Sequence, residues 1–345
     1  MTSIRASRAS AHSNIALVKY WGKREGVDPE LNLPAVGSLS MTLDELRSVT
    51  EIRAASADSF VLDGELVTGK PAAKVFAQLD RVWRLGGRSG PRPACAVVST
   101  NHLPTAAGLA SSASGFAALS VAAAGSFGLV DTLADAPDDP ARARLSSWAR
   151  MGSGSAARSL WGGFVRLDAG TADDGSDCLA RPLFGPDHWD LRLLVVHTAR
   201  GAKQVGSTGG MESSRLTSPY YPAWVSSSQA DLDAAQQALA ARELEALGEV
   251  MEHSCFKMHA CMFATRPPLL YWNGATLEVI RAVWQLRESG GPIGFVTSDA
   301  GPHVKVLCRA HGADALADHL REVPGVHEVQ AVGPGPAASL ELIES

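Results

Sequence analysis

Lysine is scarce in this chain, and two of the lysines lie close together near its start. The sequence holds 24 arginines but only seven lysines, and Lys19 and Lys23 stand four residues apart with Tyr20 between them. Ammonium groups bind phosphate as compact point charges, and a tyrosine hydroxyl is a suitable partner beside them. The spacing fits a phosphate site, although a solvated strand edge is the simpler interpretation of an isolated lysine pair.

A run of small residues at 103–115 could also bind phosphate. It reads Leu-Pro-Thr-Ala-Ala-Gly-Leu-Ala-Ser-Ser-Ala-Ser-Gly and lies between an expected strand and a long alanine-rich helix. Gly108 and Gly115 allow close approach of the backbone, and Ser111, Ser112 and Ser114 place hydroxyls at a helix N-terminus, where the helix dipole favours anions. The run lacks lysine and is therefore not a Walker A loop. The alternative is a flexible turn that leads into a close-packed helix.

Two further segments carry charged side chains in positions suited to chemistry. In 152–163, Ser153 and Ser155 precede Arg158, whose planar fork of donors can grip a carboxylate or phosphate. Asp299 follows an apolar run and precedes Ala-Gly-Pro, so a tight turn could direct its carboxylate into a cleft as a general base. The alternatives are an arginine that ties down its own loop and an aspartate that caps its own turn.

Hydrophobic periodicity outlines the elements that must position these side chains. A polar stretch at 171–186 divides the chain, and we place a boundary near residue 187, with an N-terminal lobe at 1–187 and a C-terminal lobe at 188–345. The pattern predicts an α+β fold with helices covering one face of an antiparallel sheet. The expected strands span 38–45, 49–54, 60–67, 94–100, 164–167, 191–198, 293–297, 304–308 and 327–332, and the expected helices span 70–85, 109–127, 141–151, 227–240, 243–263, 275–288 and 313–322.

Composition restricts the classes of partner. The net charge is -5, which gives no general attraction to nucleic acid or anionic membrane. The first eleven residues lack the apolar core of a signal peptide, and no later run is long enough to span a bilayer, so we expect a cytoplasmic protein. The five cysteines are scattered, which predicts reduced and mostly buried thiols. Cys255 and His259 lie one helical turn apart, but no further ligands accompany them, so they are expected in the core.

Several of these segments together resemble one family. Residues 101–119 are similar to the phosphate-binding motif of the GHMP kinases, in the form found in mevalonate diphosphate decarboxylases. The segments 14–23, 31–34 and 38–43 resemble the N-terminal signature of that family, and 152–163 and 297–302 resemble its later motifs. The matching segments occur in family order and span residues 14 to 302.

The resemblance implies a two-lobe GHMP kinase fold, with an N-terminal lobe like domain 2 of ribosomal protein S5 and an α+β C-terminal lobe. It implies ATP-dependent decarboxylation of mevalonate 5-diphosphate to isopentenyl diphosphate, with ATP and Mg²⁺ required and a homodimer as the common assembly. Asp299 and Lys19 would be catalytic, and Asp299 would accept the 3-hydroxyl proton and favour the electron-poor C3 that follows. The substrate would contact Tyr20, Lys23, Ser153, Ser155, Arg158, Ser207 and Met211. The nucleotide would contact Pro104, Ala107, Gly108, Leu109, Ala110, Ser111, Ser112 and Ser114, with Ser112 reaching the ATP-bound Mg²⁺.

The sequence departs from the family pattern at three positions. Gly206 replaces the first serine of the second substrate loop, Ala157 stands where cysteine is common, and His303 stands where asparagine is common. His303 follows the proposed base closely and could alter its pKa. The rival functions are decarboxylation of mevalonate 5-phosphate, phosphorylation of mevalonate without decarboxylation, and non-catalytic ATP sensing.

Overall fold

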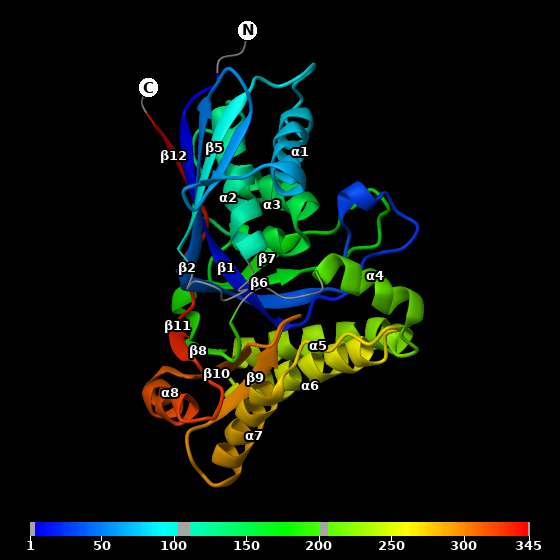
Figure 1. Cartoon of the computed structure of the whole chain (residues 1–345), viewed down its shortest axis with the longest axis vertical. Helices are drawn as coiled ribbons and strands as arrows, with labels where there is room; N and C mark the ends of the chain where they lie inside the picture. The colour runs from blue at the N-terminus through cyan, green and yellow to red at the C-terminus, as the bar shows by residue number, and fades with distance from the viewer. Residues whose placement is uncertain (1–3, 103–110, 201–205, 344–345) are drawn as a thin grey trace.

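A computed structural model describes residues 4–102, 111–200 and 206–343 of the chain. The described residues form an eight-stranded and a four-stranded sheet. In Figure 1 the first sheet and helices α1 to α3 occupy one end of the molecule, while the second sheet and helices α5 to α8 occupy the other. This combination confirms the prediction of an α+β protein with two lobes.

The first sheet is built around β2 (Ser38–Ala54), a single long strand where two were expected at 38–45 and 49–54. The strand order is β12-β1-β2-β5-β3-β4, and β6 joins β2 and β7 to one side. The pairing of β3 with β5 is parallel and the others are antiparallel. The remaining strands are β1 (Ser7–Val18), β3 (Ser59–Leu62), β4 (Glu65–Leu66), β5 (Cys95–His102), β6 (Phe164–Leu167), β7 (Ala180–Phe184) and β12 (Ser339–Leu342).

Helices cover one face of this sheet. Helix α2 (Ser111–Ser126) lies directly on β1 and β2, and alanines on the buried side of α2 allow this close approach. Helices α1 (Gly69–Leu85) and α3 (Pro140–Gly152) pack against α2, and the 3-10 helix η2 (Gly154–Leu160) follows α3. The core between these elements therefore holds α2 and η2 in fixed positions, and both carry predicted site residues.

The second sheet has the order β11-β8-β10-β9, and all its pairings are antiparallel. Helices pack on both of its faces, which corrects the expectation that helices cover one face only. Apolar side chains of α5 and α6 meet one face, and those of α7 and α8 meet the other. The strands are β8 (Leu191–His197), β9 (Gly294–Ser298), β10 (Val304–Arg309) and β11 (Glu328–Val332), and the helices are α4 (Ser207–Thr217), α5 (Tyr221–Ala241), α6 (Leu244–Phe263), α7 (Gly274–Glu288) and α8 (Ala313–Arg321).

The two sheets share a core, which brings the ends of β1 and β9 together. Ile15 and Leu17 of β1 belong to the same apolar cluster as Val195 of β8 and Phe295 of β9. The final strand β12 returns to pair with β1, so it lies with the first sheet although the boundary near 187 assigns it to the second lobe. That boundary itself stays a prediction.

Two further observations concern the helices and the cysteines. Within the residues that the structure describes, none of the helices combines the length and the apolar character needed to cross a membrane. All five cysteines are buried and carry free thiols, as the sequence predicted.

Candidate active site

The site forms where strands from the two lobes end beside each other. Lys19 follows β1, Asp299 follows β9, and the Lys19 Nζ lies 2.7 Å from the Asp299 Oδ1. The Lys19 side chain is 1% exposed, whereas that of Asp299 is 38% exposed. The pair predicted from sequence is thus brought together across 280 residues, and the carboxylate keeps an open side.

A second lysine, which the sequence analysis missed, contacts the same carboxylate. Lys305 lies in β10, beside β9, and its Nζ is 3.2 Å from the Asp299 Oδ2. Its side chain is only 4% exposed. The sequence does contain an indication of this contact. Lys305 is one of only seven lysines and stands in a mainly apolar strand, where a buried charge needs a partner of opposite charge.

The two lysines control the ionisation of Asp299. Burial alone would raise the pKa of its carboxyl, but the charges of Lys19 and Lys305 and the hydrogen bonds they donate outweigh burial and hold the pKa well below its usual range. Burial lowers the pKa of Lys305, and Asp299 opposes that shift. The carboxylate is therefore ionised at neutral pH.

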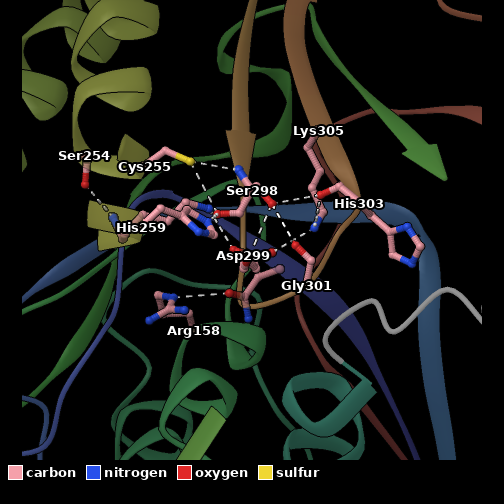
Figure 2. A network of polar contacts seen from close by, with 11 residues as sticks. Arg158, Ser254, Cys255, His259, Ser298, Asp299, Gly301, His303 and Lys305 are labelled. Carbon is pink, nitrogen blue, oxygen red and sulfur yellow. Dashed lines mark hydrogen bonds and ion pairs between the residues drawn. The ribbon is translucent and has the colours of Figure 1, made fainter. Parts of the chain in front are cut away.

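Helix α6 holds both partners of the Lys19–Asp299 pair. The Lys19 backbone N–H donates to the Ser254 Oγ at 3.0 Å, and the Ser298 N–H donates to the Cys255 Sγ at 3.1 Å. His259, one turn further, places its Nε2 3.3 Å from the Ser298 carbonyl oxygen. Figure 2 shows Cys255 and His259 directed toward Ser298, the residue just before Asp299.

These contacts give Cys255 and His259 a structural task. Strand β9 is the edge of the second sheet, and α6 accepts from two of its N–H groups, since Glu252 also accepts from the Val296 N–H at 2.8 Å. Burial and then Lys19 lower the pKa of His259 to about 3, so its neutral ring donates to the carbonyl. In the described part of the chain, no group of three His, Cys, Asp or Glu side chains is placed to hold a metal ion.

Arg158 is a buried cation without a carboxylate partner among the described residues. It lies in η2, is 2% exposed, and donates from Nε to the Asn14 Oδ1 at 3.2 Å and from Nη1 to the Ser38 Oγ at 2.7 Å. Burial lowers its pKa to about 10, with Tyr20 and Asp299 acting in the opposite direction, so it stays charged at neutral pH. A buried charge of this kind is costly unless an anion completes it, and the site accordingly fits an anionic ligand.

Tyr20 joins Arg158 to the second lysine of the N-terminal pair. The Arg158 guanidinium lies 5.6 Å from the Tyr20 ring centre, and the Lys23 Nζ is 2.7 Å from the Tyr20 hydroxyl. Ser153 and Ser155 place their hydroxyls 3.2 Å apart on either side of Gly154, above which Tyr20 and Lys23 lie. The predicted substrate residues of the first lobe therefore form one connected polar cluster.

Helix α4 carries the two remaining predicted substrate residues. Ser207 is the first residue of α4. Met211 is buried in an apolar cluster with Trp21, Met258 and Leu269. Tyr20 packs against the same cluster, so Met211 lies close to the polar residues of the first lobe.

The predicted nucleotide loop is described only in part. Pro104, Ala107, Gly108, Leu109 and Ala110 lie outside the described residues, and Ser111 begins α2. Ser112 is exposed in the first turn of this 16-residue helix, which has no acidic residue there, so the helix start fits an anion such as a nucleotide phosphate. Ser114 differs from expectation, because its hydroxyl is fully buried and bonded to those of Ser13 and Ser48, which anchors α2 to β1 and β2.

Comparison with known proteins decides the family. The N-terminal domain model of diphosphomevalonate decarboxylase-like proteins matches residues 11–180, and the C-terminal domain model of mevalonate 5-diphosphate decarboxylases matches residues 193–334. The diphosphomevalonate decarboxylase of Gibberella zeae is 36% identical, with 91% of this chain and 84% of that protein aligned. The human diphosphomevalonate decarboxylase is 34% identical, with 88% and 77% aligned. The chain belongs to the diphosphomevalonate decarboxylase family.

Solved structures of this family share the fold. The mevalonate diphosphate decarboxylase of Staphylococcus aureus superposes with a TM-score of 0.86 at 33% identity, covering 99% of this chain and 98% of that one. That of Enterococcus faecalis gives 0.85 at 34% identity, with 99% and 100% covered. A structure designated MDDEF, in complex with MVAPP, AMPPCP and magnesium, gives 0.87 at 34% identity, with 99% and 100% covered. The two-lobe GHMP kinase fold implied by the sequence motifs is confirmed.

The departures from the family pattern now have positions. The His303 ring points away from Asp299 (Figure 2) and packs 5.2 Å from the His197 ring. Its backbone carbonyl, which any residue would supply, accepts from the Ser298 hydroxyl at 3.2 Å. Ala157 is buried within η2, and Gly206 precedes α4 with open space around its Cα. A direct effect of the His303 ring on the carboxylate is therefore not favoured.

Proposed function

We propose that this chain converts mevalonate 5-diphosphate and ATP into isopentenyl diphosphate, ADP, phosphate and carbon dioxide. The observation that carries the proposal is the arrangement of one partly open carboxylate, Asp299, between Lys19 and Lys305, with the unpaired guanidinium of Arg158 nearby. Such a site attracts a substrate with several negative charges and offers one base. Family membership supplies the reaction class, since MVAPP and a nucleotide analogue are bound in a solved relative.

Asp299 is proposed to accept the proton of the substrate 3-hydroxyl. The carboxylate is ionised, and its open side leaves a lone pair for the hydroxyl while the lysines hold its two oxygens. Its second expected task, stabilising an electron-poor C3, is less well supported. Two ammonium groups against one carboxylate leave a local excess of positive charge, which opposes cation development nearby.

Arg158 is proposed to bind the substrate carboxylate until carbon dioxide leaves. Asn14 and Ser38 fix its guanidinium from one side, so its orientation does not depend on the ligand. Among the described residues no carboxylate forms an ion pair with the buried guanidinium, so Arg158 is expected to gain stabilisation when an anion binds.

Lys23 and Tyr20 are proposed to bind the diphosphate end, with Ser153 and Ser155 completing the substrate surface. The Lys23 Nζ also donates to the Asn32 Oδ1, which holds the lysine in place before substrate arrives. Ser207 is proposed to contact the substrate from the start of α4, and Met211 to do so from the apolar cluster that it shares with Trp21.

The residues at the start of α2 are proposed to hold the nucleotide. Ser112 would contact the Mg²⁺ carried by ATP, and that ion supplies charge neutralisation for phosphoryl transfer. We further propose a cytoplasmic homodimer, which light scattering of the purified protein tests.

The function is tested with mevalonate that carries zero, one or two 5-phosphates, each supplied with ATP and Mg²⁺. We expect ADP, phosphate and carbon dioxide in equal amounts with the diphosphate, and a lower kcat/KM with the monophosphate. Release of ADP without carbon dioxide would instead identify a kinase, and equal kcat/KM for mono- and diphosphate would remove the proposed role of Lys23 and Tyr20.

A further inference from the structure

Lys305 holds the side of Asp299 that Lys19 leaves free. Its Nζ contacts the Asp299 Oδ2 at 3.2 Å and the His303 carbonyl oxygen at 3.4 Å. Strand β10 pairs with β9 through Val304–Ser298 and Lys305–Thr297, so Lys305 lies opposite the last residues of β9 and Asp299 follows them directly. Lys19, in contrast, reaches the carboxylate from the other lobe. The contact with Lys305 therefore positions Asp299 independently of how the lobes meet.

Stability alone gives no reason for a second buried lysine. Both ammonium groups are almost fully buried, and one carboxylate can balance only one of them. Burying an unbalanced charge typically costs several kcal/mol, so an apolar residue in β10 would be more stable. The arrangement makes sense when the lysine serves the carboxylate in the reaction.

We propose that Lys305 is a positioning residue that keeps Asp299 ionised and oriented for proton transfer. The inference rests on the proposed function, in which Asp299 must be deprotonated before it can accept the hydroxyl proton. Removing the Lys305 charge raises the pKa of Asp299, because burial then acts against a single ammonium group. Activity that depends on ionised Asp299 then falls at acid pH more than at alkaline pH.

The other groups around Asp299 do not replace this charge. Arg158 acts from η2 without a hydrogen bond to the carboxylate among the described contacts. On α6, burial raises the pKa of the Cys255 thiol and lowers that of His259 to about 3, so both are neutral near pH 7. His303 is also neutral, since burial, Lys305 and His197 lower its pKa to about 4.

The test compares kcat/KM of Lys305→Met with that of the wild type between pH 5.5 and 8.5, with mevalonate 5-diphosphate and ATP. Substrate and nucleotide titrate identically for the two enzymes, so their titration cancels in the ratio of wild-type to variant kcat/KM. We expect the wild-type advantage to grow as the pH falls from 8.5 to 5.5, because the variant carboxyl has a higher pKa and loses its ionised form at a higher pH than the wild type. A ratio independent of pH would overturn the proposal.

Two further variants separate the possible causes. Lys257 is another mostly buried lysine, and its Nζ lies 2.5 Å from the Asp231 Oδ2, outside the candidate site. For Lys257→Met, the ratio of wild-type to variant kcat/KM should not change with pH. In an Asp299→Asn background, Lys305→Met should change the residual kcat less than about twofold, since it acts through Asp299. An undiminished effect in that background would also overturn the proposal.

The wild-type profile distinguishes failure of this inference from failure of the function. If the wild type releases no carbon dioxide, the proposed function is wrong. If the wild type is active and the Lys305→Met ratio is flat, only the role of Lys305 is wrong. If Lys305→Met does not fold, Lys305→Gln, which keeps an N–H donor but no charge, takes its place with the same expected pH dependence.

Discussion

Asp299→Asn is the substitution with the most informative combination of effects. It keeps the size of the side chain but removes both the base and the negative charge. Local sequence reasoning predicts that folding is largely unchanged, because asparagine can still cap the turn. The structure alters this expectation, since the carboxylate oxygens contact Lys19 and Lys305, and the turn is closed by the backbone bond from the Gly301 N–H to the Asp299 carbonyl oxygen.

The magnitudes follow from these contacts. Loss of a positioned general base lowers kcat by about 10³-fold, or roughly 4 kcal/mol at the transition state. Removing one partner of a buried ion pair typically costs about 3 to 5 kcal/mol of folding stability. Because the Asp299 side chain is 38% exposed, water already screens part of its interaction, and we expect a loss of about 2 to 3 kcal/mol.

The stability loss should depend on pH in a definite direction. Without the carboxylate, burial lowers the pKa of Lys305 in the folded variant below that of the unfolded chain. The unfolded state then binds more protons, so the variant gains stability as pH rises. Wild-type Asp299, with a lowered pKa, contributes its full stabilisation at every pH above the unfolded value near 4. The difference between the proteins is therefore larger at pH 7 than at pH 9.5.

Urea unfolding at both pH values and steady-state release of carbon dioxide measure these effects. Asp231→Asn is the matched control, because it breaks the Lys257 pair and should reduce stability without reducing kcat per folded molecule. The mechanism would be refuted if folded Asp299→Asn turned over at near the wild-type rate. An unchanged unfolding free energy would show that the two lysines do not depend on the carboxylate.

Three other substitutions test separate parts of the site. Arg158→Lys keeps the charge but loses the planar fork, so kcat/KM should fall by about 2 to 4 kcal/mol while urea unfolding shows a folded protein; near-normal kcat/KM would make Arg158 structural. Gly154→Ala places a Cβ 2.1 Å from the Tyr20 hydroxyl, so KM for the diphosphate substrate should rise severalfold with little change in Tm, and an unchanged KM would remove Tyr20 from the binding surface. Glu252→Gln weakens the contacts of α6 with the Val296 N–H and with Arg287, and should lower the unfolding free energy by about 1 to 3 kcal/mol. Glu278→Gln, in an exposed ion pair, should change it by less than about 0.5 kcal/mol. Equal effects of the two substitutions would contradict a stabilising role of Glu252.

Much of the site was accessible from short segments of sequence. Three local patterns indicated it: small residues before a long helix, an arginine after spaced serines, and an aspartate in a tight turn. For each pattern, the resemblance to a family favours one chemical role over the structural alternative. Local periodicity also predicted most helices and strands, because the burial of one face is written into the spacing of apolar residues. It did not predict that β2 is continuous or that β12 returns to the first sheet.

Only the tertiary structure decided which side chains meet. The serine-rich motif predicts a nucleotide contact for Ser114, but a motif does not show which distant residues cover a side chain, and in the structure Ser13 and Ser48 bind its hydroxyl. The sequence places Cys255 and His259 in the core and assigns them no further role, whereas in the structure both contact Ser298, the residue before Asp299. The sequence likewise does not show which residue lies next to Lys305. Its charge is tolerated in a buried strand because the neighbouring strand ends in a carboxylate, and that proximity follows from strand pairing.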